Sequence, residues 1–240
     1  MGVGGRASYN GITFTDTDRR VHTGEHGSID LRPVPKWQRA VRKKLSRIPL
    51  LRGLTLFLHP GMGLLLAALA VNDALTLAGA DWNGGVTDTV LLAAAVALLV
   101  VLVVRHKKGG GIGAVRRYHA AEHMAINLYE VGTPVTAENV AAAERTHPRC
   151  GTNLVVIMLP LSVPVALFCP YALELVPVVC VAYEVFLALP KKRWLKPLLT
   201  ACLWVQRHIT TVAPGGKEIE AAVQGMRRLA EGGTTPKRAA

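Results

Sequence analysis

The sequence predicts an all-α fold, a polytopic membrane protein with about four transmembrane helices and a cytoplasmic helical segment between the second and third. Half of the 240 residues are hydrophobic but only 5% are aromatic. The apolar content is therefore mainly aliphatic, as in helices that face hydrocarbon. Long aliphatic runs, of which residues 90–104 are the clearest, approach the length that a membrane span requires. Basic residues cluster beside these runs, as they do at membrane flanks.

The first 53 residues divide into two predicted segments. Residues 1–34 are rich in Gly, Thr and Asp and are predicted to form a polar N-terminal arm, with a short strand near Ile12. Residues 35–53 contain Trp37 and Val41 at helical spacing among many Lys and Arg residues. This pattern is typical of a basic amphipathic helix at a membrane surface. It predicts a lipid bilayer with anionic headgroups as a partner.

Residues 54–211 are predicted to form the membrane domain. The first span lies within residues 54–80 and is interrupted by Pro60, which allows a kink. The second covers residues 86–104 and ends at a basic cluster. Residues 154–189 are almost entirely apolar, which is long enough for a hairpin of two further spans.

The basic clusters also predict an orientation. They precede the first span and follow the second and fourth, so the positive-inside rule places both termini and residues 105–153 in the cytoplasm. The predicted location is the inner (plasma) membrane, with a homo-oligomer as one possible state. Residues 212–240 are expected to form a soluble helix and tail, because one stripe of apolar residues recurs at helical spacing. The stripe consists of Ile219, Val223, Met226 and Leu229.

The net charge of +12 would also attract nucleic acid. The basic residues, however, lie beside the apolar runs, where the positive-inside rule already explains them. We therefore expect no nucleic-acid partner.

Residues 114–131 contain no Gly or Pro and are predicted to be a helix that carries chemistry. His119, Glu122 and His123 lie on one face of such a helix. Two His residues four apart can bind one metal ion, with the Glu as a base for water, which is the inverted arrangement of some zinc peptidases. The alternative is a solvated face on which the His residues pair with Glu122 or Glu130.

A second cluster follows at residues 147–151. His147 and Cys150 are three residues apart in a turn fixed by a Pro and a Gly, and they would complete a tetrahedral site with His119 and His123. Arg149 would hold an anionic substrate or activate Cys150 as a nucleophile. The alternative is a membrane-entry turn whose polar groups cap a helix.

Glu184 is the third candidate. It lies in the predicted fourth span, roughly 10 Å from its cytoplasmic end. An ionisable group within a span suggests a function and a partner. Glu184 is a candidate metal ligand, proton relay or ion-pair partner of Arg149.

The chain resembles a bacterial family of membrane proteins of unknown function, the YqhQ-like proteins. The matching stretches are residues 48–53, 118–123, 129–130, 136–140, 147–152, 183–184, 203–207, 210–211 and 214. The resemblance implies a metal-dependent membrane enzyme. The chain departs from the family at Ala120 and Met124, and residues 4–11 only faintly echo a Gly-rich N-terminal motif.

Two hypotheses remain. In the first, the protein is a metal-dependent membrane enzyme, a hydrolase, with a divalent metal that is zinc or, less expectedly, iron. His119 and His123 bind the metal, while His147, Cys150 or Glu184 supplies further ligands, and Glu122 and Arg149 are catalytic. In the second, the same groups form a structural metal site or polar network in a non-catalytic scaffold, assembly factor or small transporter.

Overall fold

The computed structural model describes residues 3–16, 19–24, 27–31, 33, 35–58, 67, 70–71, 73–74, 111–168 and 175–231. These residues divide into two compact units. Unit 1 contains residues 1–34, 99–147 and 203–240, and unit 2 contains residues 35–98 and 148–202. The predicted second span lies outside the described part of the chain, and so does most of the first, of which only residues 54–58, 67, 70–71 and 73–74 are described.

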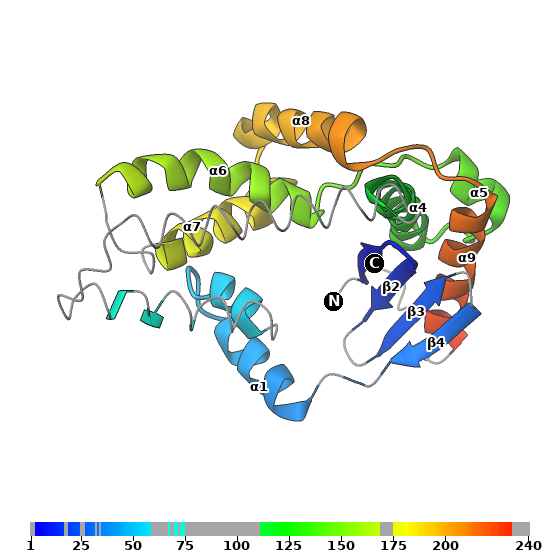
Figure 1. Cartoon of the computed structure of the whole chain (residues 1–240), viewed down its shortest axis with the longest axis horizontal. Coiled ribbons are helices and arrows are strands. Elements are labelled where there is room, and N and C mark those ends of the chain that lie inside the picture. The colour runs from blue at the N-terminus through cyan, green and yellow to red at the C-terminus, as the bar shows by residue number, and fades with distance from the viewer. Residues whose placement is uncertain are drawn as a thin grey trace. The chain divides into compact units, whose positions relative to one another are not determined.

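Unit 1 is built on a four-stranded antiparallel meander in which each strand pairs with the next along the chain (Figure 1). The strands are β1 (Gly4–Ser8), β2 (Gly11–Thr15), β3 (Arg20–Gly24) and β4 (Gly27–Leu31). Ile12 and Phe14 alternate with polar residues along β2, and Val21 pairs with Phe14 across the sheet. All three side chains are fully buried, because alternate residues of a strand share one face.

Two helices cover this sheet. Helix α9 (Gly216–Glu231) lies across β2, β3 and β4, and helix α4 (Ile112–Val131) lies along β1. The predicted apolar stripe of residues 219–229 is the face of α9 that packs into the core. Gly225 allows the close approach, since a Cβ there would lie 2.7 Å from the Phe14 ring. Helix α4 ends at Gly132, which has a left-handed φ of 75° and thus favours glycine.

The remaining elements of unit 1 are short. Helix α5 (Ala137–Ala142) begins at Thr136, whose side chain caps it by accepting a hydrogen bond from the Asn139 N–H. Helix α8 (Lys196–Val205) runs from unit 2 into unit 1 and continues into a π-helical turn, η5 (Gln206–Thr210). Such turns occur often at functional sites.

Unit 2 is helical. Helix α6 (Gly151–Phe168) packs against α7 (Leu175–Ala188), while α1 (Lys36–Leu45) and α7 both contact the 3₁₀ turn η1 (Arg52–Leu58). A second 3₁₀ turn, η4 (Arg193–Leu195), leads into α8. Ile157, Ala182 and Leu189 are in its apolar core.

The structure corrects the predicted fold class. The chain is not all-α, because the N-terminal arm folds into a sheet with its own buried core. Nor does any helix among the described residues combine the length and the apolar character needed to cross a bilayer. Helix α7 has 14 residues, or about 21 Å, against a hydrocarbon core of about 30 Å. In the part of the chain that the structure describes, these findings contradict the predictions of a polytopic protein with four spans and of a multi-pass inner-membrane location.

Candidate metal centre

Helix α4 brings His119 and His123 together as their spacing predicts. The two ring centroids lie 4.3 Å apart. His119 Nδ1 lies 3.1 Å from the carbonyl oxygen of Thr210, at the end of η5, and His123 Nδ1 lies 2.9 Å from that of Arg145. A carbonyl oxygen only accepts, so each ring donates its Nδ1–H, and in a neutral ring the lone pair is then on Nε2. Neutral imidazole binds metal ions in this form, and a hydrogen bond on the other nitrogen orients it.

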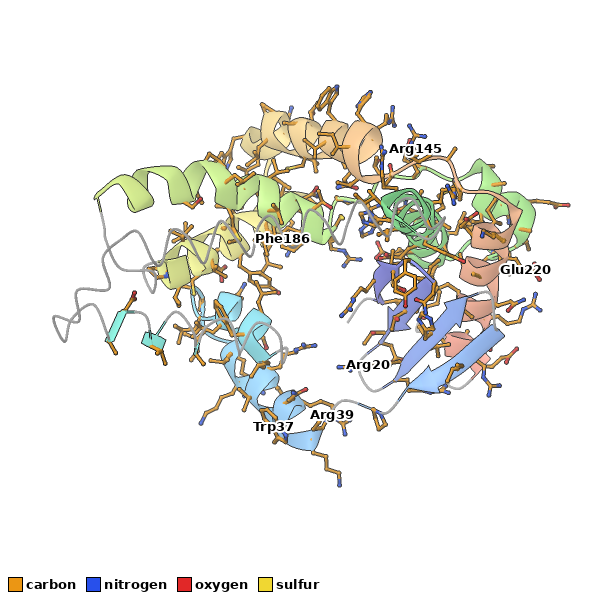
Figure 2. The ribbon with its side chains drawn as sticks, in the orientation of Figure 1. Arg20, Trp37, Arg39, Arg145, Phe186 and Glu220 are labelled. Carbon is orange, nitrogen blue, oxygen red and sulfur yellow. The ribbon has the colours of Figure 1, made fainter. Side chains whose placement is uncertain are left out.

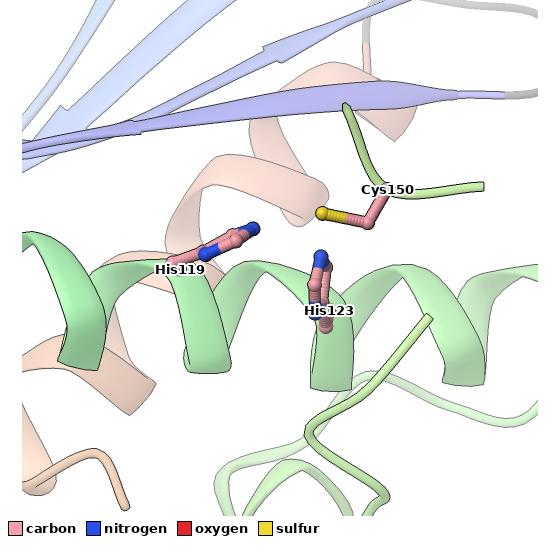
Figure 3. A group of neighbouring side chains, drawn as sticks. All are labelled: His119, His123 and Cys150. Carbon is pink, nitrogen blue, oxygen red and sulfur yellow. The ribbon is translucent and has the colours of Figure 1, made fainter. Parts of the chain in front are cut away.

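Cys150 completes a group of potential ligands with the two histidines (Figure 3). One ligand atom from each of His119, His123 and Cys150 lies within 4.8 Å of the others. His123 and Cys150 are buried. Within the described part of the chain, this is the one group of three or more His, Cys, Asp or Glu residues with that proximity.

The donor set fits zinc. Two imidazole nitrogens and one thiolate are ligands that zinc binds at about 2.0–2.3 Å in tetrahedral geometry, which separates ligand atoms by about 3.4–3.8 Å. The upper limit of 4.8 Å exceeds this separation by about 1 Å, so small side-chain rotations suffice to close the site. Three protein ligands leave a fourth position open, as in catalytic zinc sites.

His147 lies beside the group without belonging to it. Its ring centroid is 5.8 Å from that of His123, and its Nε2 lies 3.4 Å from a carboxylate oxygen of Glu130. Burial lowers the pKa of His147. The fully buried Gln206 side chain fixes its backbone: it accepts from the His147 N–H at 2.9 Å and donates to the His147 carbonyl at 3.0 Å.

Glu122 is buried on α4 and faces β1. A Cβ added to Gly5 would overlap the Glu122 carboxylate, so this position of the strand has room for little more than glycine. The Glu122 carboxylate is not in the group formed by His119, His123 and Cys150. Its role as a base remains a prediction.

The structure places the other two predicted site residues differently. Arg149 is exposed. Glu184 lies on α7 in unit 2, where one oxygen accepts the Leu50 N–H at 3.0 Å and the other lies 3.5 Å from the Arg52 guanidinium. The ion-pair partner of Glu184 shown here is thus Arg52, whereas the sequence suggested Arg149.

A hollow of about 470 Å³ opens in unit 1 beside α4. Its lining includes Met124 of α4, Ile219 of α9 and the charged residues Glu144, Arg145 and Arg207. Arg145 also supplies the carbonyl that orients His123. Arg145 therefore contacts both the hollow and His123, whereas none of His119, His123 and Cys150 lines the hollow.

Sequence reasoning missed the groups that support the histidines. The Thr210 and Arg145 carbonyls carry no side-chain signal, since every residue has such an oxygen. Gln206 and Gly5 were detectable in principle. Gln206 lies in one of the stretches shared with the family, and Gly5 lies in the Gly-rich segment at the N-terminus.

Comparison with known proteins agrees with the resemblance. The model of the family described as "Protein of unknown function (DUF1385)" matches residues 48–231. The chain belongs to this family. It is also similar to the "Uncharacterized protein YqhQ" of Bacillus subtilis (strain 168), with 34% identity over 128 residues, which are 48% of this chain and 40% of that protein. The chain thus matches less than half the length of this relative. No solved structure matches the chain.

Proposed function

We propose that this protein binds one divalent metal ion, zinc or alternatively iron, through His119, His123 and Cys150, and that it is a metal-dependent hydrolase. One observation carries the proposal: the potential ligand atoms of these residues lie within 4.8 Å of one another. The hydrogen bonds to both Nδ1 atoms support it, because they present each Nε2 as a ligand.

The surroundings favour a catalytic role for the ion. A metal ion with three protein ligands supplies a Lewis acid that polarises a carbonyl or phosphoryl oxygen. Glu122, one turn along α4 from His119, would be the base that takes a proton from water. The hollow beside Arg145 and Arg207 offers space for a substrate, and its two guanidinium groups favour a negatively charged one.

A structural metal site in a non-catalytic scaffold is the second candidate. The burial of His123 and Cys150 supports it, because closed and buried sites are typical of structural zinc. The packing of Glu122 against Gly5 also suits a structural carboxylate. The catalytic and the structural candidates predict different effects of replacing Glu122 on hydrolysis.

The first experiment measures metal content. Purified protein is analysed for zinc and iron beside His119→Ala/His123→Ala, with His22→Ala/His208→Ala as a control that removes two histidines outside the group. We expect about one metal ion per chain in the parent and the control, and almost none in the first variant. An equal metal content in all three proteins would refute the site.

The second experiment separates catalysis from structure. Glu122→Gln preserves shape and removes the base, so we expect it to retain the metal and to lose hydrolysis of a panel of ester, peptide and phosphate substrates by about 100-fold or more. Cys150→Ser serves as the comparison that loses the metal. If Glu122→Gln also loses the metal, the base assignment is wrong. If the metal-loaded parent hydrolyses nothing in the panel, the structural site is favoured.

A further inference from the structure

Helix α1 of unit 2 exposes its apolar side chains. Trp37 (Figure 2) is 60% exposed and Val41 is 37% exposed, and none of the helix's side chains is buried. The contact with η1 includes a hydrogen bond from a polar residue, Gln38, whose amide donates to the Leu58 carbonyl at 3.2 Å. An amphipathic helix that packed on a protein core would bury its apolar stripe.

The apolar stripe continues beyond the helix. Trp37 and Val41 lie within about 40° of each other around the helix axis. Ile48 and Leu50, in the turn that follows, are 47% and 54% exposed. A run of exposed, large apolar side chains of this kind marks an interaction surface more often than a plain solvent face.

The charge of this segment is entirely positive. No Asp or Glu occurs between Pro35 and Leu58. The basic side chains that lie exposed here are Lys36, Arg42, Lys43, Lys44 and Arg47. A partner must therefore offer negative charge together with an apolar layer just beneath it.

We infer that α1 binds the surface of a lipid bilayer that carries anionic headgroups and lies in the interface without crossing it. Trp side chains favour the interface because an apolar ring and a polar N–H meet there. Lys and Arg keep their charged ends among the phosphates while their aliphatic stems lie along apolar groups. Near an anionic surface, each such residue adds about a fivefold gain in partitioning. The ten residues of α1 cover about 15 Å, which suits a surface helix and not a span.

The test is sedimentation of the full-length protein with vesicles. One set contains phosphatidylglycerol and phosphatidylcholine in equal parts, and the other contains phosphatidylcholine alone. We expect the protein to bind the anionic vesicles and scarcely the neutral ones, and the binding to weaken as salt is added. Lys43→Glu/Lys44→Glu and Trp37→Ala should each weaken it about tenfold or more.

Two matched controls use unit 1. Arg227→Glu/Arg228→Glu makes the same charge change on α9, and Trp204→Ala removes a tryptophan that is 57% exposed. Both should bind anionic vesicles as the parent does, and circular dichroism should show that all variants are folded. The inference is wrong if the parent ignores anionic vesicles or if the controls weaken binding as much as the α1 variants. It is also wrong if the α1 variants instead dissociate a self-associated form, which would make a second copy of the chain the partner.

Discussion

His119 and His123 on α4 and Glu184 on α7 were all predicted to be metal ligands, but their hydrogen-bond partners differ. His119 and His123 each donate from one ring nitrogen to a backbone carbonyl, which in the neutral ring places the lone pair on the other nitrogen. Glu184 uses both oxygens, one on the Leu50 N–H and one on Arg52. A polar side chain on a helix is therefore a candidate metal ligand only where its neighbours orient it and do not occupy all of its electron-donating atoms.

The contacts of Glu184 stabilise an unusual backbone. Leu50 has a φ of 65°, a left-handed conformation that costs a non-glycine residue about 1 kcal/mol or more. Its N–H donates to Glu184, and Gly53, close by, lies against the backbone of α7 at Cys180. Glu184 thus stabilises the backbone of residues 48–53 within unit 2. His119, His123 and Cys150, by contrast, have the donor set of a metal-binding site.

The largest effect that would test this contrast is expected at Gln206. Gln206→Leu removes both partners of the buried His147 backbone, so the free energy of unfolding should fall by about 1–3 kcal/mol. Zinc affinity should fall about tenfold or more, because η5 also carries the Thr210 carbonyl that orients His119. Denaturant titration and competition with a zinc chelator measure the two effects.

Gln224→Leu, on the exposed side of α9, is the control. Unchanged zinc affinity in Gln206→Leu would show that η5 does not support the site.

A smaller effect is expected at Glu184. Glu184→Gln retains an oxygen for the Leu50 N–H and removes the charge facing Arg52. Because both side chains are partly exposed, the free energy of unfolding should fall by only about 1 kcal/mol. Metal content, measured by elemental analysis, should stay at the parent value. A loss of metal from Glu184→Gln would return this residue to the ligand set and remove the contrast between the two regions.

The smallest effect concerns Glu144, at the edge of the hollow in unit 1. Burial would raise the pKa of Glu144, but the hydrogen bond and charge of Arg207, together with Thr146, lower it below its usual 4.5. Because the folded protein has the lower pKa, the carboxylate's contribution to stability is complete above 4.5 and is lost as the pH falls through the folded value.

Arg207→Gln should therefore lower stability at neutral pH by no more than about 0.5 kcal/mol, since both side chains are half exposed and screened by solvent. Denaturant unfolding of the parent and the variant at neutral pH and well below pH 4.5 should show the difference vanish in acid. A difference that grows in acid would mean that the Glu144–Arg207 pair is not its source.

Elements with a strong helical period were predictable, whereas of the sheet only one strand was predicted, the one near Ile12 that the structure shows as β2. The stripe of residues 219–229 is part of helix α9, because i, i+3 and i+4 spacing is a local signal. The segment around His119, which contains no Gly or Pro, is helix α4. The strands are only five residues long, and Gly and Thr dilute their alternation. The aliphatic run of residues 154–189 was overinterpreted, because apolar content suits a packed helical core as well as a span, as the α6–α7 pair shows.

By itself the sequence determined the i, i+4 placement of His119 and His123, the amphipathic stripe of α9 and the family to which the chain belongs. Each depends on residue identity and spacing, which folding does not change. Only the tertiary structure decided that Thr210 orients His119, that Gln206 fixes His147 and that Glu184 pairs with Arg52. These partners are far apart along the chain, and several are backbone groups that look alike in every residue, so only the folded chain brings them together.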